Sequence, residues 1–199
     1  MSRSLLKCLV IFQMICWALL VAPRVFAADT VQCHAVQVDA ADPQSYLPDP
    51  RCTPGVIDPT VRQDNLGTTI CQKGYSKRVR PSSSYTTALK KKQIFQYGYK
   101  NVDPKNYEED HLISLELGGS PTDPRNLWPE PHPSINEKDQ VENALHAQIC
   151  SGQKTLAQAQ YAIAHNWYDV YLEQNPPSFI EMIEHALSSF WANVKSIFL

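Results

Sequence analysis

The sequence predicts an α+β fold, with a small hairpin-plus-helix core, additional helices and a cysteine-stapled, proline-rich N-terminal region. An apolar stretch broken at Gly118-Gly119 and followed by a second apolar stretch is typical of a hairpin. Later segments have helical spacing behind capping signals. Residues 28–80 combine five prolines with three cysteines. We interpret the chain as a leader followed by one domain.

The first 27 residues have the pattern of a secretory signal peptide. Arg3 and Lys7 precede an apolar run over residues 8–22, and Val25-Phe26-Ala27 fits a cleavage site. The run is shorter than the ~20 residues of a membrane-spanning helix. An uncleaved anchor is the alternative, which Pro23 disfavours. We therefore expect a periplasmic or secreted domain over residues 28–199, with no membrane span in the mature chain and enough length for one core.

Cysteine usage points to disulfides. Cys8 and Cys16 belong to the leader, and Cys33, Cys52, Cys71 and Cys150 remain in the domain. An even number in an exported chain favours two disulfides, with three connectivities open. No C-x-x-C pair supports the competing zinc site.

The charge of the domain is unevenly distributed. The leader removes three of the 18 basic residues and none of the 20 acidic ones, which leaves 15 against 20 and a net charge of −5. Residues 73–105 nevertheless carry nine basic residues against the single acid Asp103. This run predicts a nucleic-acid track rather than an ordinary solvated face. The residues expected to bind nucleic acid are Arg78, Arg80, Lys90, Lys91 and Lys92.

Residues 28–80 are expected to form irregular structure and short strands, because prolines and turn residues interrupt their apolar pieces. Residues 84–97, SYTTALKKKQIFQY, predict a helix on the spacing of Leu89, Ile94 and Phe95, with Gly98 at its C-terminal end. Residues 111–117, HLISLEL, predict a strand buried on much of both faces. Residues 118–125 then form the turn, and NLW begins the return strand.

Capping signals place the remaining helices. Ser134 and Glu137 form a capping box before a stripe of Val141, Leu145 and Ile149, and Gly152 ends that helix. Thr155 with Gln158 opens a helix over residues 156–172, which completes a core over residues 84–172. Ser178 with Glu181 opens a C-terminal amphipathic helix over residues 178–199. We expect that helix to dock onto the domain, with a membrane-surface position as the alternative.

The pair Asp110-His111 is the strongest chemical signal. It opens the string DHLISLELGG, which NLWPE, KDQVEN, ICSG and AQYAIAHNW follow. Together, across roughly residues 52–172, these motifs resemble the HNH-type (His-Me finger) endonucleases, in particular small exported bacterial proteins of that superfamily. The resemblance implies a ββα-metal core. It also implies an endonuclease that hydrolyses phosphodiester bonds with little sequence specificity, in DNA more readily than in RNA.

The resemblance also implies residue roles. His111 is the expected general base, which suits a neutral imidazole, and Asn126 orients its ring. Asp110 is the expected ligand of a divalent cation, which such hydrolysis needs beside the phosphate. The family's second helical histidine is absent here, so the second ligand is expected at Asn136, with His132 as the alternative. Mg²⁺ is the expected ion, with Mn²⁺ or Zn²⁺ open.

Other residues near the pair have simpler explanations. Glu108 and Glu109 are either solvated or assist the cation. Gly118-Gly119 is interpreted as a turn requirement, and Trp128 as core packing. Histidines such as His146 have no partner pattern and are assigned no role.

Two further functions compete with the nuclease. One is a catalytically inactive, disulfide-stapled binding protein of the same fold. The retention of Asp110, His111 and Asn126 together argues against it. The other is a hydrolase of a different anionic polymer of the cell envelope. The oligomeric state is left open by the sequence.

Overall fold

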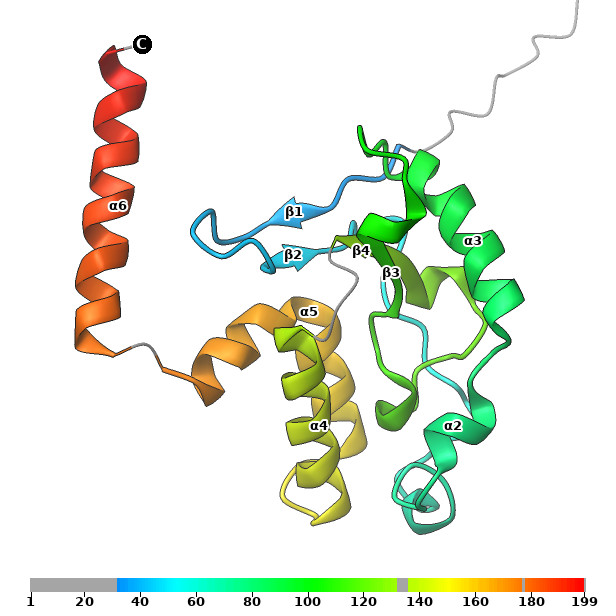
Figure 1. The fold of residues 1–199 in the computed structure, drawn as a ribbon. Helices are drawn as coiled ribbons and strands as arrows, with labels where there is room; N and C mark the ends of the chain where they lie inside the picture. Colours follow the sequence, from blue (N-terminus) through cyan, green and yellow to red (C-terminus); the bar gives the residue numbers. More distant parts are fainter. Residues whose placement is uncertain (1–31, 132–135, 177, 199) are drawn as a thin grey trace, which may run out of the picture. The chain divides into compact units, whose positions relative to one another are not determined.

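The structure is a computed structural model that describes residues 32–131, 136–176 and 178–198. It has the expected α+β composition, with two small antiparallel sheets and a set of helices (Figure 1). The leader expected at residues 1–27 lies outside the described residues, as do His132 and Ser134.

The N-terminal region is mostly irregular, as expected. Strands β1 (Val36–Gln37) and β2 (Tyr46–Leu47) pair antiparallel. A disulfide joins Cys33 to Cys52. A 3-10 turn (Leu66–Thr68) and the short helix α2 (Tyr75–Val79) follow. Helix α2 was not predicted from the sequence.

Helix α3 (Ser83–Gln96) confirms the predicted helix and packs beside the hairpin. The Ser82 side chain caps it, and Gly98 follows it with a positive φ of 63°. Its inward face differs from the prediction, because Ile94 is buried while Phe95 is 68% exposed. Gln93 is buried as well and donates hydrogen bonds to the carbonyls of Pro124 and Leu127, which attaches the helix to the second strand.

The predicted hairpin is present, but its first strand lies earlier in the chain. Strand β3 (Tyr107–His111) pairs antiparallel with β4 (Leu127–Pro131), and His111 lies opposite Leu127. The strand expected over residues 111–117 is therefore wrong beyond His111. The chain leaves the sheet there and includes a 3-10 turn (Leu115–Leu117). The reason is burial without alternation, since Leu112, Ile113, Leu115 and Leu117 are all buried in this irregular segment.

Matching turns introduce the strands of the hairpin. Asp103-Pro104-Lys105-Asn106 precedes β3, and Asp123-Pro124-Arg125-Asn126 precedes β4. Both form 3-10 turns (Pro104–Asn106 and Pro124–Asn126) in which the aspartate accepts a hydrogen bond from the amide two residues later. This repeated Asp-Pro-basic-Asn signal marks both strand starts.

Helices α4 (Glu137–Cys150) and α5 (Leu156–Gln174) pack against each other and against the 3-10 turn that follows β3 (Figure 1). Helix α4 begins with a capping box of Asn136 and Asp139, so the box predicted at Ser134 and Glu137 is wrong by two residues. The capping box of Thr155 and Gln158 is confirmed. Helix α5 is kinked at Asn166, where φ is −160° and ψ is 91°.

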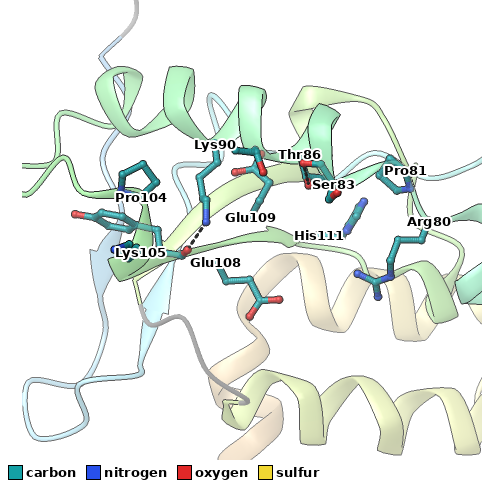
Figure 2. A pocket seen from close by; sticks show the side chains of 12 residues that line it. Arg80, Pro81, Ser83, Thr86, Lys90, Pro104, Lys105, Glu108, Glu109 and His111 are labelled. Atoms are coloured by element: carbon teal, nitrogen blue, oxygen red, sulfur yellow. Dashed lines mark hydrogen bonds between the residues drawn. The ribbon is translucent and has the colours of Figure 1, made fainter.

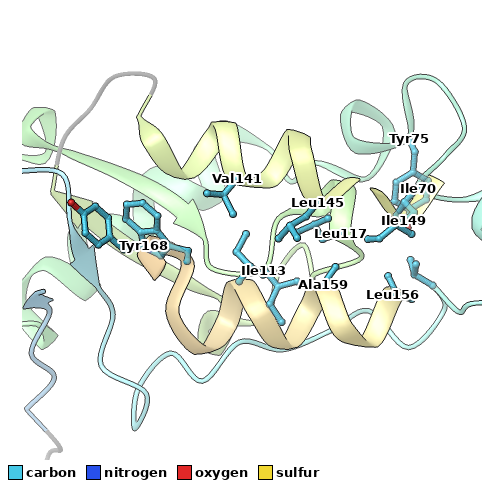
Figure 3. Close-up of a cluster of buried hydrophobic side chains, with 13 residues drawn as sticks. Ile70, Tyr75, Ile113, Leu117, Val141, Leu145, Ile149, Leu156, Ala159 and Tyr168 are labelled. Atoms are coloured by element: carbon cyan, nitrogen blue, oxygen red, sulfur yellow. The ribbon is translucent and has the colours of Figure 1, made fainter. Parts of the chain in front are cut away.

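The main hydrophobic core lies between α4, α5 and the segment that follows β3 (Figure 3). Its buried side chains include the predicted stripe of Val141, Leu145 and Ile149. A disulfide between Cys71 and Cys150 ties the end of α4 to the segment before α2. Both disulfides are thus present, with the pairing that the sequence left open.

Several large apolar side chains of helix α6 (Phe179–Phe198) are exposed, among them Phe179 at 73% and Phe190 at 58%. The expected docking of this helix onto the domain is therefore not found among its described side chains. No helix in the described part of the chain is long and apolar enough to span a bilayer.

Candidate functional site

Strand alternation separates the side chains of the central pair. Asp110 and His111 are the last residues of β3, so consecutive side chains leave the strand on opposite faces. His111 lines a pocket beside α3, whereas Asp110 contacts Lys138 of α4. The pair therefore serves two different environments.

The pocket on the His111 side has a volume of about 570 Å³ and combines both signs of charge (Figure 2). Its walls come from the end of α2, the first turns of α3, the turn before β3, and β3 itself. The lining residues are Arg80, Pro81, Ser83, Thr86, Thr87, Lys90, Pro104, Lys105, Tyr107, Glu108, Glu109 and His111.

The ring of His111 is buried, and its protonation can be assigned from its partner. Nε2 lies 3.0 Å from the carbonyl oxygen of Pro121. A carbonyl only accepts, so Nε2 carries the hydrogen and Nδ1 keeps its lone pair. Burial lowers the pKa of His111, against the smaller raising effects of the Pro121 carbonyl and the Asp110 charge. The imidazole is therefore a neutral base that can accept a proton at Nδ1.

Asn126 does not contact the ring it was expected to orient. Its Oδ1 accepts from the Ile113 amide at 3.0 Å, and its Nδ2 donates to the carbonyls of Ile113 and Ser120, each at 3.0 Å. The expected contact between Asn126 and the His111 ring is therefore wrong. Asn126 braces the loop after β3, and that loop carries the Pro121 carbonyl.

The glycine pair meets a conformational requirement of the same loop. A Cβ on Gly119 would lie 1.7 Å from the Ile113 carbonyl oxygen, and Gly118 has a positive φ of 74°. Neither position accepts a side chain without displacing the loop.

Asp110 is held by a buried ammonium group. Its Oδ2 lies 2.9 Å from Lys138 Nζ and accepts a hydrogen bond from Trp128 Nε1 at 3.1 Å. Lys138 is 1% exposed and also donates to the His111 carbonyl and to Glu142. A lysine thus stands where a metal ion was expected. The contacts of Asp110 with Lys138 and Trp128 both involve Oδ2, and the other carboxylate oxygen of Asp110, Oδ1, has no hydrogen-bond partner among the described residues.

Three carboxylates surround this one ammonium group. Burial alone would lower the pKa of Lys138, but the charges of Asp110, Glu142 and Glu130 raise it well above its ordinary value. Burial raises the pKa of Glu130 and of Glu142. Lys138 therefore stays charged, with the Asp110 and Glu142 carboxylates as its ion-pair partners.

Asn136 is engaged on both atoms of its amide. Its Oδ1 accepts from the Asp139 amide as the cap of α4, and its Nδ2 donates to Glu130 Oε2 at 2.9 Å. It is therefore not free to act as the expected second metal ligand. The alternative ligand, His132, lies outside the described residues.

The pocket itself offers carboxylates that fit a cation. Both oxygens of Glu109 are buried without a hydrogen-bond partner in the described part of the chain. Burial, with a contribution from Asp110, raises the pKa of Glu109 to about 8 and that of Glu108 to about 7. Carboxylate oxygens without partners suit a hard divalent ion, which would favour their ionised form. The pocket residues thus fit the expected cofactor better than Asn136 does.

The predicted nucleic-acid residues divide between two places. Arg80 and Lys90 line the pocket, and Lys90 Nζ donates to the Tyr107 carbonyl at 2.8 Å. Lys91 and Lys92 are exposed and are not part of the pocket wall. Arg78 is exposed too, bonding to Gln72 and lying 5.4 Å from the centre of the Tyr75 ring.

A second group of potential ligands was missed in the sequence. One ligand atom each from Cys71, His146 and Cys150 lies within 4.8 Å of the others, so the group could hold a metal ion. The available signal was the four-residue spacing of His146 and Cys150, which puts both on one helical face. In the structure the two cysteines are joined as a disulfide.

Comparison with known proteins adds no assignment. No family model, curated protein or solved structure matches this chain.

Proposed function

We propose that this protein is an exported, metal-dependent nuclease that hydrolyses phosphodiester bonds, in DNA more readily than in RNA, at the pocket of β3. The observation that carries the proposal is the neutral, buried His111 in one pocket with the unpartnered carboxylate of Glu109 and the cations Arg80 and Lys90. The resemblance to HNH-type endonucleases and their ββα-metal core supports it, since a hairpin and a helix follow in the required order.

In this proposal His111 removes a proton from the attacking water at Nδ1. Its Nε2–H stays bonded to Pro121, so the ring does not rotate as it gains charge. Arg80, Lys90 and Lys105 bind the phosphates of the substrate, and such contacts carry little sequence information.

A divalent cation would be held beside His111 by the carboxylate of Glu109, whose two oxygens lack hydrogen-bond partners among the described residues. When bound, such an ion stabilises the charge that develops on the phosphate. Mg²⁺ is the proposed ion, because the available ligands are oxygens.

Export is part of the proposal. Disulfides form and persist mainly in oxidising compartments. This chain has two of them. The leader-like first 27 residues point to the same compartments, the periplasm or the medium.

The test is plasmid digestion by the oxidised mature chain with Mg²⁺, Mn²⁺ or Zn²⁺, and then with a chelator. His111→Ala should lose roughly 10²–10⁴-fold in rate, the usual contribution of a general base. The control is His165→Ala, because His165 stacks on Tyr161 and is absent from the pocket wall. Digestion by His111→Ala at the parent's rate would show that the assignment is wrong.

A second experiment separates the candidate ligands. Glu109→Gln should weaken Mn²⁺ binding in a calorimetric titration and lower activity by a matching factor. Asp110→Asn is the comparison, measured at a temperature where both variants are folded. If only Asp110→Asn loses the ion, the cation is held on the Lys138 side of the strand.

One observation favours an inactive binding protein instead. Lys138 pairs with Asp110, the expected metal ligand, and thereby blocks one of its oxygens. Under that reading the chain retards DNA in a gel shift, no divalent ion produces cleavage, and His111→Ala binds like the parent.

A further inference from the structure

The last turn of α4 meets the segment before α2 at a compact sulfur and nitrogen cluster. His146 and Cys150 lie four residues apart on α4, and His146 Nε2 is 3.4 Å from Cys150 Sγ. Cys71 reaches the same point from the other segment through its disulfide with Cys150. Cys150 is exposed, so solutes reach the cluster.

We propose that Cys71, His146 and Cys150 form a redox-gated site for a thiophilic divalent ion such as Zn²⁺. The site is closed while the disulfide exists, because disulfide sulfurs are not thiolates. Two thiols, or a phosphine with one water, supply two electrons and two protons; the disulfide becomes two thiols, and the reductant leaves as a disulfide or a phosphine oxide. Binding of the ion then releases those two protons and forms two metal–sulfur bonds and one metal–nitrogen bond.

The positions of the ligand atoms suit such an ion after a small movement. Tetrahedral zinc, with bonds of ~2.3 Å to sulfur and ~2.0 Å to nitrogen, needs sulfurs roughly 3.8 Å apart and a nitrogen roughly 3.5 Å from each. Nε2 of His146 already lies at such a distance from Cys150 Sγ. The two sulfurs, once reduced, have only to separate by side-chain rotation.

Glu116 supplies the outer partner that a ligating histidine needs. Nε2 of His146 now bonds to the Ile70 carbonyl at 2.9 Å, while Nδ1 lies 3.9 Å from Glu116 Oε2. If Nε2 ligates, the ring hydrogen moves to Nδ1 and faces that carboxylate. Carboxylate–histidine–metal arrangements of this kind fix the ring and strengthen the ligand.

The fourth position is open to solvent. A pocket of about 260 Å³ adjoins the cluster, and Cys71, Glu116 and His146 are among its lining residues. Three protein ligands with one open position are typical of zinc sites that bind a water or a small ligand. The Cys33–Cys52 disulfide differs in two ways. Cys33 is buried, and the described residues contain no second group of three or more histidine, cysteine or acidic side chains placed to hold a metal ion.

The test uses Co²⁺ alone as the probe, on the mature chain with Cys33→Ser and Cys52→Ser so that only the proposed cysteines remain. After phosphine reduction the chain should show sulfur-to-cobalt charge-transfer absorption that saturates at one Co²⁺ per chain, and the oxidised chain should show no such absorption. His146→Ala should weaken binding at least about tenfold, and Glu116→Gln by ~10–100-fold. His165→Ala is the matched control and should bind as the parent does.

The proposal is overturned if the reduced chain gives no charge-transfer band, or if His146→Ala binds Co²⁺ as tightly as the parent. If the background substitutions prevent folding, the intact chain is reduced and compared with Cys71→Ser. Zn²⁺ should then raise the Tm of the reduced parent more than that of Cys71→Ser. An equal rise in both would place the ion elsewhere.

Discussion

At the scale of single residues, Lys138 decides the chemistry on one side of the hairpin. A fully buried ammonium group is costly unless anions and hydrogen bonds compensate it. Here the Asp110 carboxylate, the Glu142 carboxylate and the His111 carbonyl supply that compensation. The same lysine therefore holds both the side chain of Asp110 and the backbone carbonyl of His111.

Lys138→Met should destabilise the domain by about 3–5 kcal/mol, because it leaves buried carboxylates without their cation. The measurement is urea denaturation followed by circular dichroism. Lys92→Met, at an exposed position of α3, is the control and should change the unfolding free energy by less than about 0.5 kcal/mol. A loss below about 1 kcal/mol for Lys138→Met would mean that the ion pairs contribute little.

At the scale of elements, capping signals and helical stripes could be predicted, while the extent of β3 could not. Thr155 and Gln158 act locally, so their capping box can be recognised in the sequence. Strand β3 ends at His111 because the side chain of Asn126, fifteen residues later, forms hydrogen bonds with the amide and the carbonyl of Ile113. These bonds hold Ile113 in the loop. The consecutive apolar side chains of this loop are all buried. In the sequence they therefore give the same pattern as a strand buried on both faces.

Gly119→Ala tests how tightly that loop is built. The added Cβ would meet the Ile113 carbonyl oxygen, and backbone on both sides must shift to relieve the overlap. We expect a loss of about 1–3 kcal/mol or more in thermal or urea unfolding. Gly67→Ala is the matched control, since nothing lies within 4 Å of its Cβ position. Equal effects of the two substitutions would show that the loop adapts freely.

At the scale of the whole molecule, residues of the candidate site could be predicted from the sequence, but the face of β3 on which each side chain lies could not. His111, expected in the site, does line the pocket, and Glu109, for which the sequence leaves solvation and assistance to the cation open, lies buried in the same pocket wall. Whether a carboxylate is solvated or buried without a partner depends on α3 packing over β3. That packing brings together segments far apart in the chain, so local pattern cannot reveal it.

The two disulfides should contribute unequally to stability. Cys71–Cys150 spans 79 residues and Cys33–Cys52 spans 19. Closing the longer loop removes more entropy from the unfolded chain, about 4.5 kcal/mol against about 3.3 kcal/mol. Replacing Cys71 and Cys150 by serine should therefore lower the unfolding free energy more than replacing Cys33 and Cys52. The reverse order in urea denaturation would contradict this prediction.

The metal-free domain should lose stability as the pH rises from about 5 to about 8.5. Burial raises the pKa of Glu108 to about 7 and that of Glu109 to about 8, from an ordinary 4.5. Between these values the folded chain holds protons that the unfolded chain has released. The stabilisation from this difference is complete below pH 4.5 and is lost as the pH rises through 7 and 8. The lowered pKa of His111 acts oppositely, and its contribution is lost as the pH falls below 6.5.

Thermal unfolding in chelator across this pH range measures the effect. Glu109→Gln removes one of the titrating groups, so its Tm should fall less steeply toward pH 8.5 than that of the parent. Glu173→Gln, on an exposed site of α5, should follow the parent. A parental slope in Glu109→Gln would show that Glu109 is already ionised in the fold. Mn²⁺ added at pH 8 should raise the Tm of the parent more than that of Glu109→Gln, because a bound cation stabilises only the ionised carboxylate.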